Sequence, residues 1–356
     1  MVALTERQRG VLVAAAGVLC VTPDAVLLRW AQTQGANTSG ILFWKFFFIC
    51  IFTSMWVAYL ESRNKPPGGV LASLYKRVQS GPTHFWACVT LQISLDVLFS
   101  LAFLIIAAAR VMIWYSLNVL WSAFLGYALL GDVLPRRTVI CCAFALGCIA
   151  MVFGPELADG STKSNPLGDL AAIYVGIAVA VYLIIVRHAA RERPRVPVTF
   201  ATCVGALGAV LLVALSSLVT GDRLMPIGVT WRFYVCMALD GFAIAILFVA
   251  FSIAPRYITG AEVSLCSLLE TVLGPLWVFL VYREAPGPYT LAGGLLLIGS
   301  LFVHEYMAAR EAVARRNRAR REEATARAMA VVAGGPSSGD GSADSLPEKL
   351  SAADSV

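Results

Sequence analysis

The chain has 356 residues, of which 58% are hydrophobic and only 14% are charged. In an average soluble domain about a quarter of the residues are charged, so this composition argues against a soluble enzyme and indicates a membrane protein. The formal net charge is +6, but the basic residues lie in loops and in a tail beside apolar runs. That placement favours a positive-inside bias over nucleic-acid binding.

Ten apolar runs fill residues 10 to 306. Each is about as long as a helix must be, roughly 20 residues, to cross a hydrocarbon core about 30 Å thick. The predicted spans are 10–30, 39–60, 84–106, 110–130, 138–154, 168–187, 197–219, 232–253, 259–281 and 287–306. The predicted fold class is therefore all-α integral membrane, with ten transmembrane helices.

Lys and Arg residues gather on one side of these spans. With the N-terminal segment (1–9) in the cytoplasm, the inner side holds Arg7, Arg9, Arg63, Lys65, Lys76, Arg77, Arg136, Arg137, Arg187, Arg191, Arg193, Arg195, Arg256 and the cluster from Arg310 to Arg327. The outer side holds only Arg29, Arg110, Lys163, Arg223, Arg232 and Arg283. This asymmetry predicts that both termini are cytoplasmic, and we expect the plasma membrane rather than an organelle.

The end of the chain differs from the spans. Residues 307–330 are rich in Ala, Arg and Glu without Gly or Pro, which predicts a basic cytoplasmic helix. Residues 331–356 are rich in Gly, Ser, Ala and Asp and cannot bury enough apolar surface to fold, so we expect a disordered tail.

The ten spans divide into two halves of five, residues 10–154 and 168–306. Asp132 and Glu284 each follow the last residues of a span, and Asn118 and Glu270 lie 14 positions before them. An odd number of spans in each half predicts that the second half has the opposite orientation in the membrane, which makes the halves inverted five-helix repeats.

Several motifs resemble the EamA-type members of the drug/metabolite transporter superfamily over nearly all of residues 10 to 306. The motifs are Pro255-Arg256-Tyr257-Ile258-Thr259-Gly260-Ala261-Glu262-Val263, Leu268-Leu269-Glu270-Thr271-Val272-Leu273-Gly274-Pro275-Leu276-Trp277-Val278, Glu284 with Pro286 and Gly293-Gly294, Thr22-Pro23-Asp24-Ala25 with Arg29, and Leu42-Phe43-Trp44-Lys45. The chain departs from the pattern at Lys45, where members usually carry Arg, and at Ala123, where many carry Pro.

The resemblance implies a secondary carrier with inverted five-helix repeats that moves a small polar metabolite or a drug, often outward. It implies a small-molecule substrate and the lipid bilayer as partners, with no cofactor, and it names no cargo. A membrane-embedded enzyme and a non-transporting scaffold are the alternative functions. The three His residues (His84, His188, His304) lie near span ends and no metal or nucleophile motif is present, so we expect neither an enzyme nor a metal site. A homodimer is a further alternative for the assembly of the chain.

Four polar residues, Asp96, Asn118, Asp240 and Glu270, lie near the middle of predicted spans. An Asp at that depth costs about 2.5–3.5 kcal/mol on insertion scales, so we expect all four to face a shared interior that forms the substrate or proton site. Glu270 is the strongest candidate, because a carboxyl group there can alternate between protonated and ionised forms as water enters from either side. Binding of a substrate ammonium and a purely structural carboxyl are its alternatives.

Asp24 and Lys45 lie at equal depth in the first two spans, which makes an ion pair feasible. The pair is either a gate that exposes an anion-binding Lys or a structural link between two helices. Pro23 and Pro275 each predict a helix break, because Pro has no N–H and disturbs the preceding turn. A break at Pro23 is either a hinge or a static bend.

Aromatic residues at Trp114, Tyr115 and Trp277 are candidates to line the cavity, although interface anchoring and core packing explain most such residues. The nine Cys residues lie within or at the edges of spans without a CxxC pair, so we expect small apolar packing rather than disulfide or metal chemistry.

Overall fold

The structure is a computed structural model that describes residues 5–63, 69–106, 108–131, 135–158, 165–192, 196–226, 228–283, 288–289, 291–304 and a few single positions beyond them. The basic helix predicted at 307–330 falls almost entirely outside the described residues, and the tail predicted at 331–356 lies outside them altogether. Asp132, Glu284 and Pro286, which belong to the repeat signal and the resemblance, are outside them as well.

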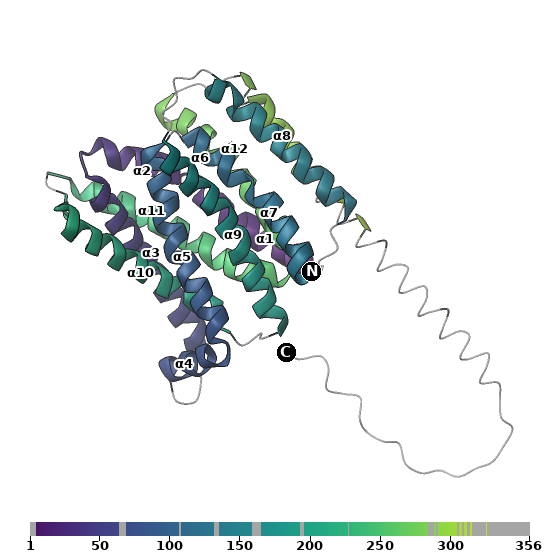
Figure 1. Cartoon of the computed structure of the whole chain (residues 1–356), viewed down its shortest axis with the longest axis horizontal. Helices are drawn as coiled ribbons and strands as arrows, with labels where there is room; N and C mark the ends of the chain where they lie inside the picture. The colour runs from purple at the N-terminus through teal and green to yellow at the C-terminus, as the bar shows by residue number, and fades with distance from the viewer. Residues whose placement is uncertain are drawn as a thin grey trace, which may run out of the picture. The chain divides into compact units, whose positions relative to one another are not determined.

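The described chain is all helical (Figure 1). Its elements are α1 (Glu6–Val21), α2 (Asp24–Thr33), α3 (Thr38–Arg63), α4 (Val70–Ser80), α5 (Pro82–Ile105), α6 (Ala108–Ser116), α7 (Asn118–Leu130), α8 (Arg136–Ala158), α9 (Pro166–Glu192), α10 (Val198–Thr220), α11 (Trp231–Ile253), the 3-10 turn η1 (Ala254–Arg256) and α12 (Gly260–Tyr282). A further apolar helix covers Leu291–His304.

Eight spans in the described residues are long and apolar enough to cross a membrane, which confirms a multi-pass all-α membrane protein. They correspond to eight of the ten predicted spans. The other two, predicted at 138–154 and 287–306, correspond to α8 and to the helix Leu291–His304, which are helical but are not among the eight.

Two predicted spans are each divided into two helices. The first is interrupted at Thr22 and Pro23, between α1 and α2. Pro23 has no N–H to donate to the carbonyl of Leu19, and the hydroxyl of Thr22 donates to that carbonyl instead at 2.9 Å. The break therefore leaves the Leu19 carbonyl satisfied inside the bundle.

The second division was not predicted. The helix stops after Ser116 and restarts at Asn118, with Leu117 N–H bonded to the carbonyl of Trp114 in a tight turn. The Ser116 hydroxyl bonds the carbonyl of Ile113 at 2.8 Å, the type of local bond by which Ser competes with a regular helix. Helix α4 was also not predicted, because its 11 residues are too few and too polar for a span.

The main core lies between α1, α3, α5, α9, α10 and α11. α3 packs against α10 and α11, α9 packs against α5 and α7, and α1 packs against α11 (Figure 1). A second cluster joins α7, α8, α12 and the helix Leu291–His304. Small residues allow these close approaches, since a Cβ on Gly17 of α1 would lie only 2.5 Å from the Cβ of Ala250 in α11.

The close contact at Gly17 predicts that adding one methyl group there destabilises the protein. Gly17→Ala should lower the free energy of unfolding by about 1–3 kcal/mol, because two backbones must separate to admit it. Chemical or thermal unfolding of the purified protein in detergent measures the loss.

Gly147→Ala in α8 is the matched control, because a Cβ there meets nothing within 4 Å. Adding Ala250→Gly to Gly17→Ala should restore most of the stability. Equal stability of Gly17→Ala and Gly147→Ala would contradict the close packing of α1 on α11.

Candidate functional site

A cavity in the main core is lined by eight helices from both halves of the chain. It contains about 710 Å³ of empty space, counting the part that is open to the outside. The polar lining residues are Asp24, Lys45, Gln92, Asp96, Ser100, Tyr115, Tyr182 and Glu270, and the apolar ones are Val21, Phe46, Ile49, Leu95, Phe99, Val175, Val179, Ile244, Leu247, Phe248 and Phe251. This combination of an apolar wall and a few convergent polar groups is typical of a small-molecule site.

Lys45 lies at the centre of a buried cluster of three charged residues. Its Nζ is 2.8 Å from Oδ1 of Asp24 and 3.5 Å from Oδ2 of Asp240. All three side chains are buried, and Asp240 is 0% exposed. The three residues come from α2, α3 and α11, so the cluster joins three helices across the bundle.

Asp24 is held at this position by the break at Pro23. As the first residue of α2, Asp24 follows the interruption and not a continuous turn of α1. Trp277 Nε1 donates to the hydroxyl of Thr22 at 2.8 Å, which connects the break to α12. The position of Asp24 therefore depends on α1, α2 and α12 together.

Asp96 lies on a second wall of the cavity with only one partner. Nε2 of Gln92, one helical turn earlier on α5, donates to Oδ1 at 3.0 Å. Oδ2 of Asp96 is buried and accepts no hydrogen bond from the described residues. A buried carboxylate oxygen without a donor is costly, which makes this atom a candidate contact for a ligand or a proton.

Glu270 lines the cavity from α12, and it is 8% exposed. No hydrogen bond or ion pair joins its carboxylate to the described part of the chain, although it is close enough to Asp24 and Lys45 to feel their charges. Its oxygens are therefore available to the contents of the cavity.

The structure does not bring all four mid-span residues to the cavity surface. Asp240 lies behind Lys45, and Asn118, at the first position of α7, is 0% exposed and is not among the lining residues. Neither polar atom of the Asn118 side chain has a partner among the described residues. The shared interior therefore has Asp96 and Glu270 on its surface, with Asp240 reaching it only through Lys45.

The aromatic candidates separate in a similar way. Tyr115 lines the cavity. In contrast, Nε1 of Trp114 donates a hydrogen bond to Asp169 at 3.1 Å, and Nε1 of Trp277 donates one to the hydroxyl of Thr22. The two Trp residues therefore join helices instead of lining the site, because an indole N–H in a membrane protein must find an acceptor.

The break predicted at Pro275 is not present, since α12 continues from Gly260 to Tyr282. Pro removes one N–H from the helix, and the turns on either side keep their own bonds, so a buried helix can continue through it.

Several lining residues were missed by the sequence analysis. Gln92 was detectable, because it lies four residues before Asp96 and so shares its helix face. Tyr182 lines the cavity with a buried hydroxyl that has no partner among the described residues. No sequence pattern marked the cavity residues Phe46, Phe99, Phe248 and Phe251. Apolar residues that face lipid and apolar residues that face a cavity look the same in a sequence.

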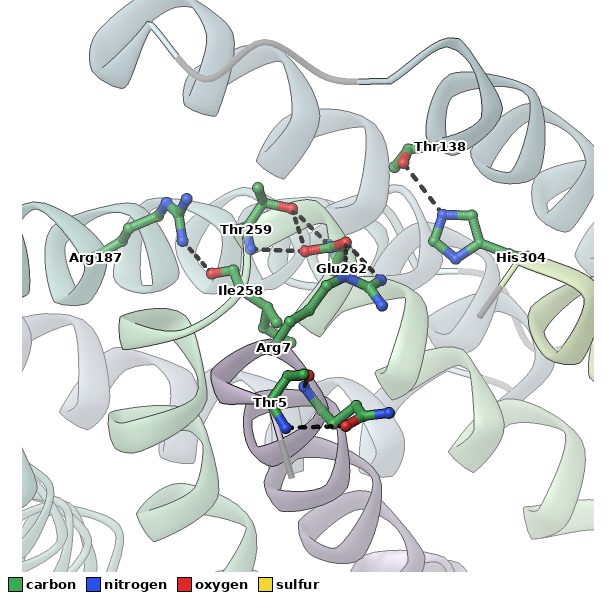
Figure 2. Close-up of polar contacts among 9 residues, drawn as sticks. Thr5, Arg7, Thr138, Arg187, Ile258, Thr259, Glu262 and His304 are labelled. Atoms are coloured by element: carbon green, nitrogen blue, oxygen red, sulfur yellow. Dashed lines mark hydrogen bonds and ion pairs between the residues drawn. The ribbon is translucent and has the colours of Figure 1, made fainter. Parts of the chain in front are cut away.

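A group of bonds at the start of α12 connects helices at one end of the bundle (Figure 2). Glu262 caps the helix by accepting from the N–H of Thr259 at 3.0 Å, and its other oxygen pairs with Arg7 of α1 at 2.8 Å. Arg187 of α9 donates to the carbonyls of Pro255 and Ile258. These contacts connect α1, α9 and α12 on the side with the Lys and Arg excess.

Among the residues that the structure describes, no group of three or more His, Cys, Asp or Glu side chains is placed to hold a metal ion. The polar groups of the cavity instead offer carboxylates, amides and hydroxyls to a dissolved molecule.

Residues 166–304 match the EamA-like transporter family, which is part of the drug/metabolite transporter superfamily. This match identifies an EamA-like domain in a multi-pass membrane protein, and the family is typically non-enzymatic. The matched range overlaps residues 168–306, predicted as the second repeat, and residues 10–154 lie outside it.

The sequence matches no curated protein. Twenty-eight chains of solved structures match. One, described as "Crystal structure of protein", has 16% sequence identity and a TM-score of 0.62, and the match covers 85% of this chain and 99% of that one. At this identity the likeness shows the fold alone.

The charge cluster predicts a large effect of removing its cation. Lys45→Met should lower the free energy of unfolding by about 3 kcal/mol, because it leaves two carboxylates buried together without a counter-charge. Unfolding of the purified protein in detergent measures this loss.

Lys76→Met, at an exposed position of α4, is the matched control and should change stability by about 0.5 kcal/mol or less. Lys45→Arg should retain most of the stability, because it keeps the charge. A Lys45→Met protein as stable as the Lys76→Met protein would show that the cluster is not a stabilising contact.

Proposed function

We propose that this chain is a secondary transporter in which two inverted five-helix halves, residues 10–154 and 168–306, expose the central cavity alternately to each side of the membrane. The single observation that carries this proposal is the cavity itself, which holds incompletely paired carboxylates at mid-span and is lined by helices of both halves. Placing an ionisable group at that depth costs free energy, and such groups usually mark a substrate or ion pathway.

The ends of α7 and α12 support the assignment of the repeats. Gly131 follows α7 with φ 62° and ψ 24°, and Arg283 follows α12 with φ 59° and ψ 21°. Asn118 and Glu270 lie the same number of residues before these left-handed caps. A non-glycine residue with a positive φ is uncommon, so the same cap at the corresponding position favours a common design for both halves.

The proposed orientation places both termini in the cytoplasm, with the plasma membrane as the host. The excess of Lys and Arg at the ends of α3, α9 and α11 supports the orientation. In that orientation the contacts of Arg7 with Glu262 and of Arg187 with Ile258 close the cytoplasmic side, and inward opening has to separate them.

Glu270 is the proposed proton carrier. It lies in the EamA-like domain, faces the cavity, and has no hydrogen-bond partner in the described chain that would hold one protonation state. Asp24 and Asp240 are less suitable, because both already pair with Lys45. Coupling follows if the proton on Glu270 and the cargo compete for the same negative charge.

The charges of the cavity favour a cargo that carries a cationic group. Asp24, Asp96 and Glu270 line the cavity against the single ammonium of Lys45, and Asp24 already shares that ammonium with Asp240. The remaining acids lack a counter-charge among the described lining residues. Phenyl rings on the wall complement the apolar part of such a molecule and can interact with its cation.

Proton coupling predicts a change in pH response. An untargeted comparison of intracellular and medium metabolites, in cells with and without the protein, first identifies the cargo. In proteoliposomes, transport of that cargo should respond to an imposed proton gradient in the native protein and should lose this response in Glu270→Gln, because an amide cannot exchange a proton.

Asp222→Asn is the control, since Asp222 lies outside the spans in the turn after α10. It should transport like the native protein. A Glu270→Gln protein that keeps the native response to the gradient, at equal reconstitution, would remove Glu270 from the coupling mechanism.

The cargo assignment predicts selective binding by charge. Phenethylammonium should bind the purified protein at least about tenfold more tightly than 2-phenylethanol or phenylacetate, which share its ring but not its charge. Asp96→Asn should reduce this preference, because it removes one of the two cavity carboxylates that have no ion pair.

Calorimetric titration in detergent measures the three affinities, and Asp222→Asn should leave them unchanged. Equal affinity for the amine and the alcohol would contradict a cationic cargo while leaving transport by the cavity intact.

A further inference from the structure

A second cavity lies away from the central one, where α3 and α11 end and α10 begins. It contains about 690 Å³ of empty space, counting its open part, and α4 supplies one of its walls. Its polar lining residues are Glu61, Arg77, Thr199 and Arg256. None of them belongs to the proposed transport site, so this cavity needs its own explanation.

Positive charge exceeds negative charge in this cavity. Arg77 pairs with Glu61 through one nitrogen, but its Nε is buried and donates to no described residue. Arg256 is exposed to the cavity opening, and none of the described residues accepts a hydrogen bond from it. Both guanidinium groups line the cavity, and Glu61 pairs with only one of them. An anion in the cavity would compensate the remaining positive charge.

The backbone around the cavity adds to the positive field. Val196, Pro197, Thr199 and Phe200 line it at the first turn of the 23-residue helix α10. The N–H groups of Val198 and Phe200 already donate to the carbonyls of Val196 and Pro197, so they are not free donors. The partial positive charge at this end of the helix still favours a bound anion. Arginine adds planar donors that suit the oxygens of a phosphate.

The position of the cavity indicates where its anion comes from. It lies at the ends of membrane-spanning helices, on the side that the Lys and Arg counts predict to be cytoplasmic. Anionic phospholipids are concentrated in that leaflet. Helix α4 buries Leu74 and exposes Tyr75 and Lys76, the pattern of a helix with one face on the protein and one toward the surroundings.

We propose that this cavity binds the phosphate of an anionic phospholipid headgroup, with the guanidinium groups of Arg256 and Arg77 as its donors. A lipid held there contacts α3, α4, α10 and α11 at once. The bound lipid therefore stabilises this end of the bundle. The proposal does not depend on the function of the central cavity.

Native mass spectrometry of the full chain tests the proposal. Protein released from micelles with equal amounts of phosphatidylglycerol and phosphatidylcholine should retain phosphatidylglycerol preferentially. Arg256→Gln should weaken this retention by about tenfold or more, because it removes a charge-assisted contact. Arg232→Gln is the matched control, since Arg232 is an exposed arginine at the opposite end of α11, and it should retain the lipid like the native protein.

A second variant, Glu61→Gln with Arg77→Gln, removes the ion pair without a net change of charge and should weaken retention as well. Unfolding in phosphatidylcholine micelles confirms that each variant is folded. Equal retention by Arg256→Gln and Arg232→Gln would overturn the proposal. Displacement of phosphatidylglycerol by millimolar inorganic phosphate would assign the site to a free anion and overturn the lipid assignment.

Discussion

The ion-pair cluster of Lys45 with Asp24 and Asp240 is the contact on which the arrangement of the bundle depends. Ionisable groups this deep in a membrane are tolerated only when they compensate one another. Because the three residues belong to α2, α3 and α11, their compensation requires those helices to meet at one level. It also leaves Asp96 and Glu270 as the acids on the cavity wall without an ion pair to a described residue, and their chemistry is the basis of the proposed transport.

The helix break at Pro23 and the cluster depend on each other. Pro23 ends α1, Thr22 satisfies the carbonyl that the break exposes, and Asp24 then begins α2 beside Lys45. The Trp277 contact extends this arrangement to α12, which also carries Glu270. The helix that carries Glu270 is therefore joined directly to the break in the first span.

Sequence reasoning located the membrane helices because hydrocarbon requires long apolar runs with internally bonded backbones, and this requirement is visible in any window of about 20 residues. It also identified Asp24, Lys45, Asp96 and Glu270, because a charge inside an apolar run is conspicuous. It did not find the interruption at Leu117, because no Pro lies there to indicate a break. The interruption is instead accompanied by a local hydrogen bond from the Ser116 hydroxyl to the carbonyl of Ile113. The short helix α4 was missed for the opposite reason, since it is too polar to resemble a span.

The sequence by itself determined that the chain is a multi-pass membrane protein, where eight of its spans lie and which residues carry charge into them, because these are properties of single segments and of their hydration. Only the tertiary structure decided which charges are paired, since pairing depends on the rotation and depth of helices far apart in the chain. For the same reason it alone placed Asp240 behind Lys45, removed Asn118, Trp114 and Trp277 from the cavity wall, and added Gln92 to it.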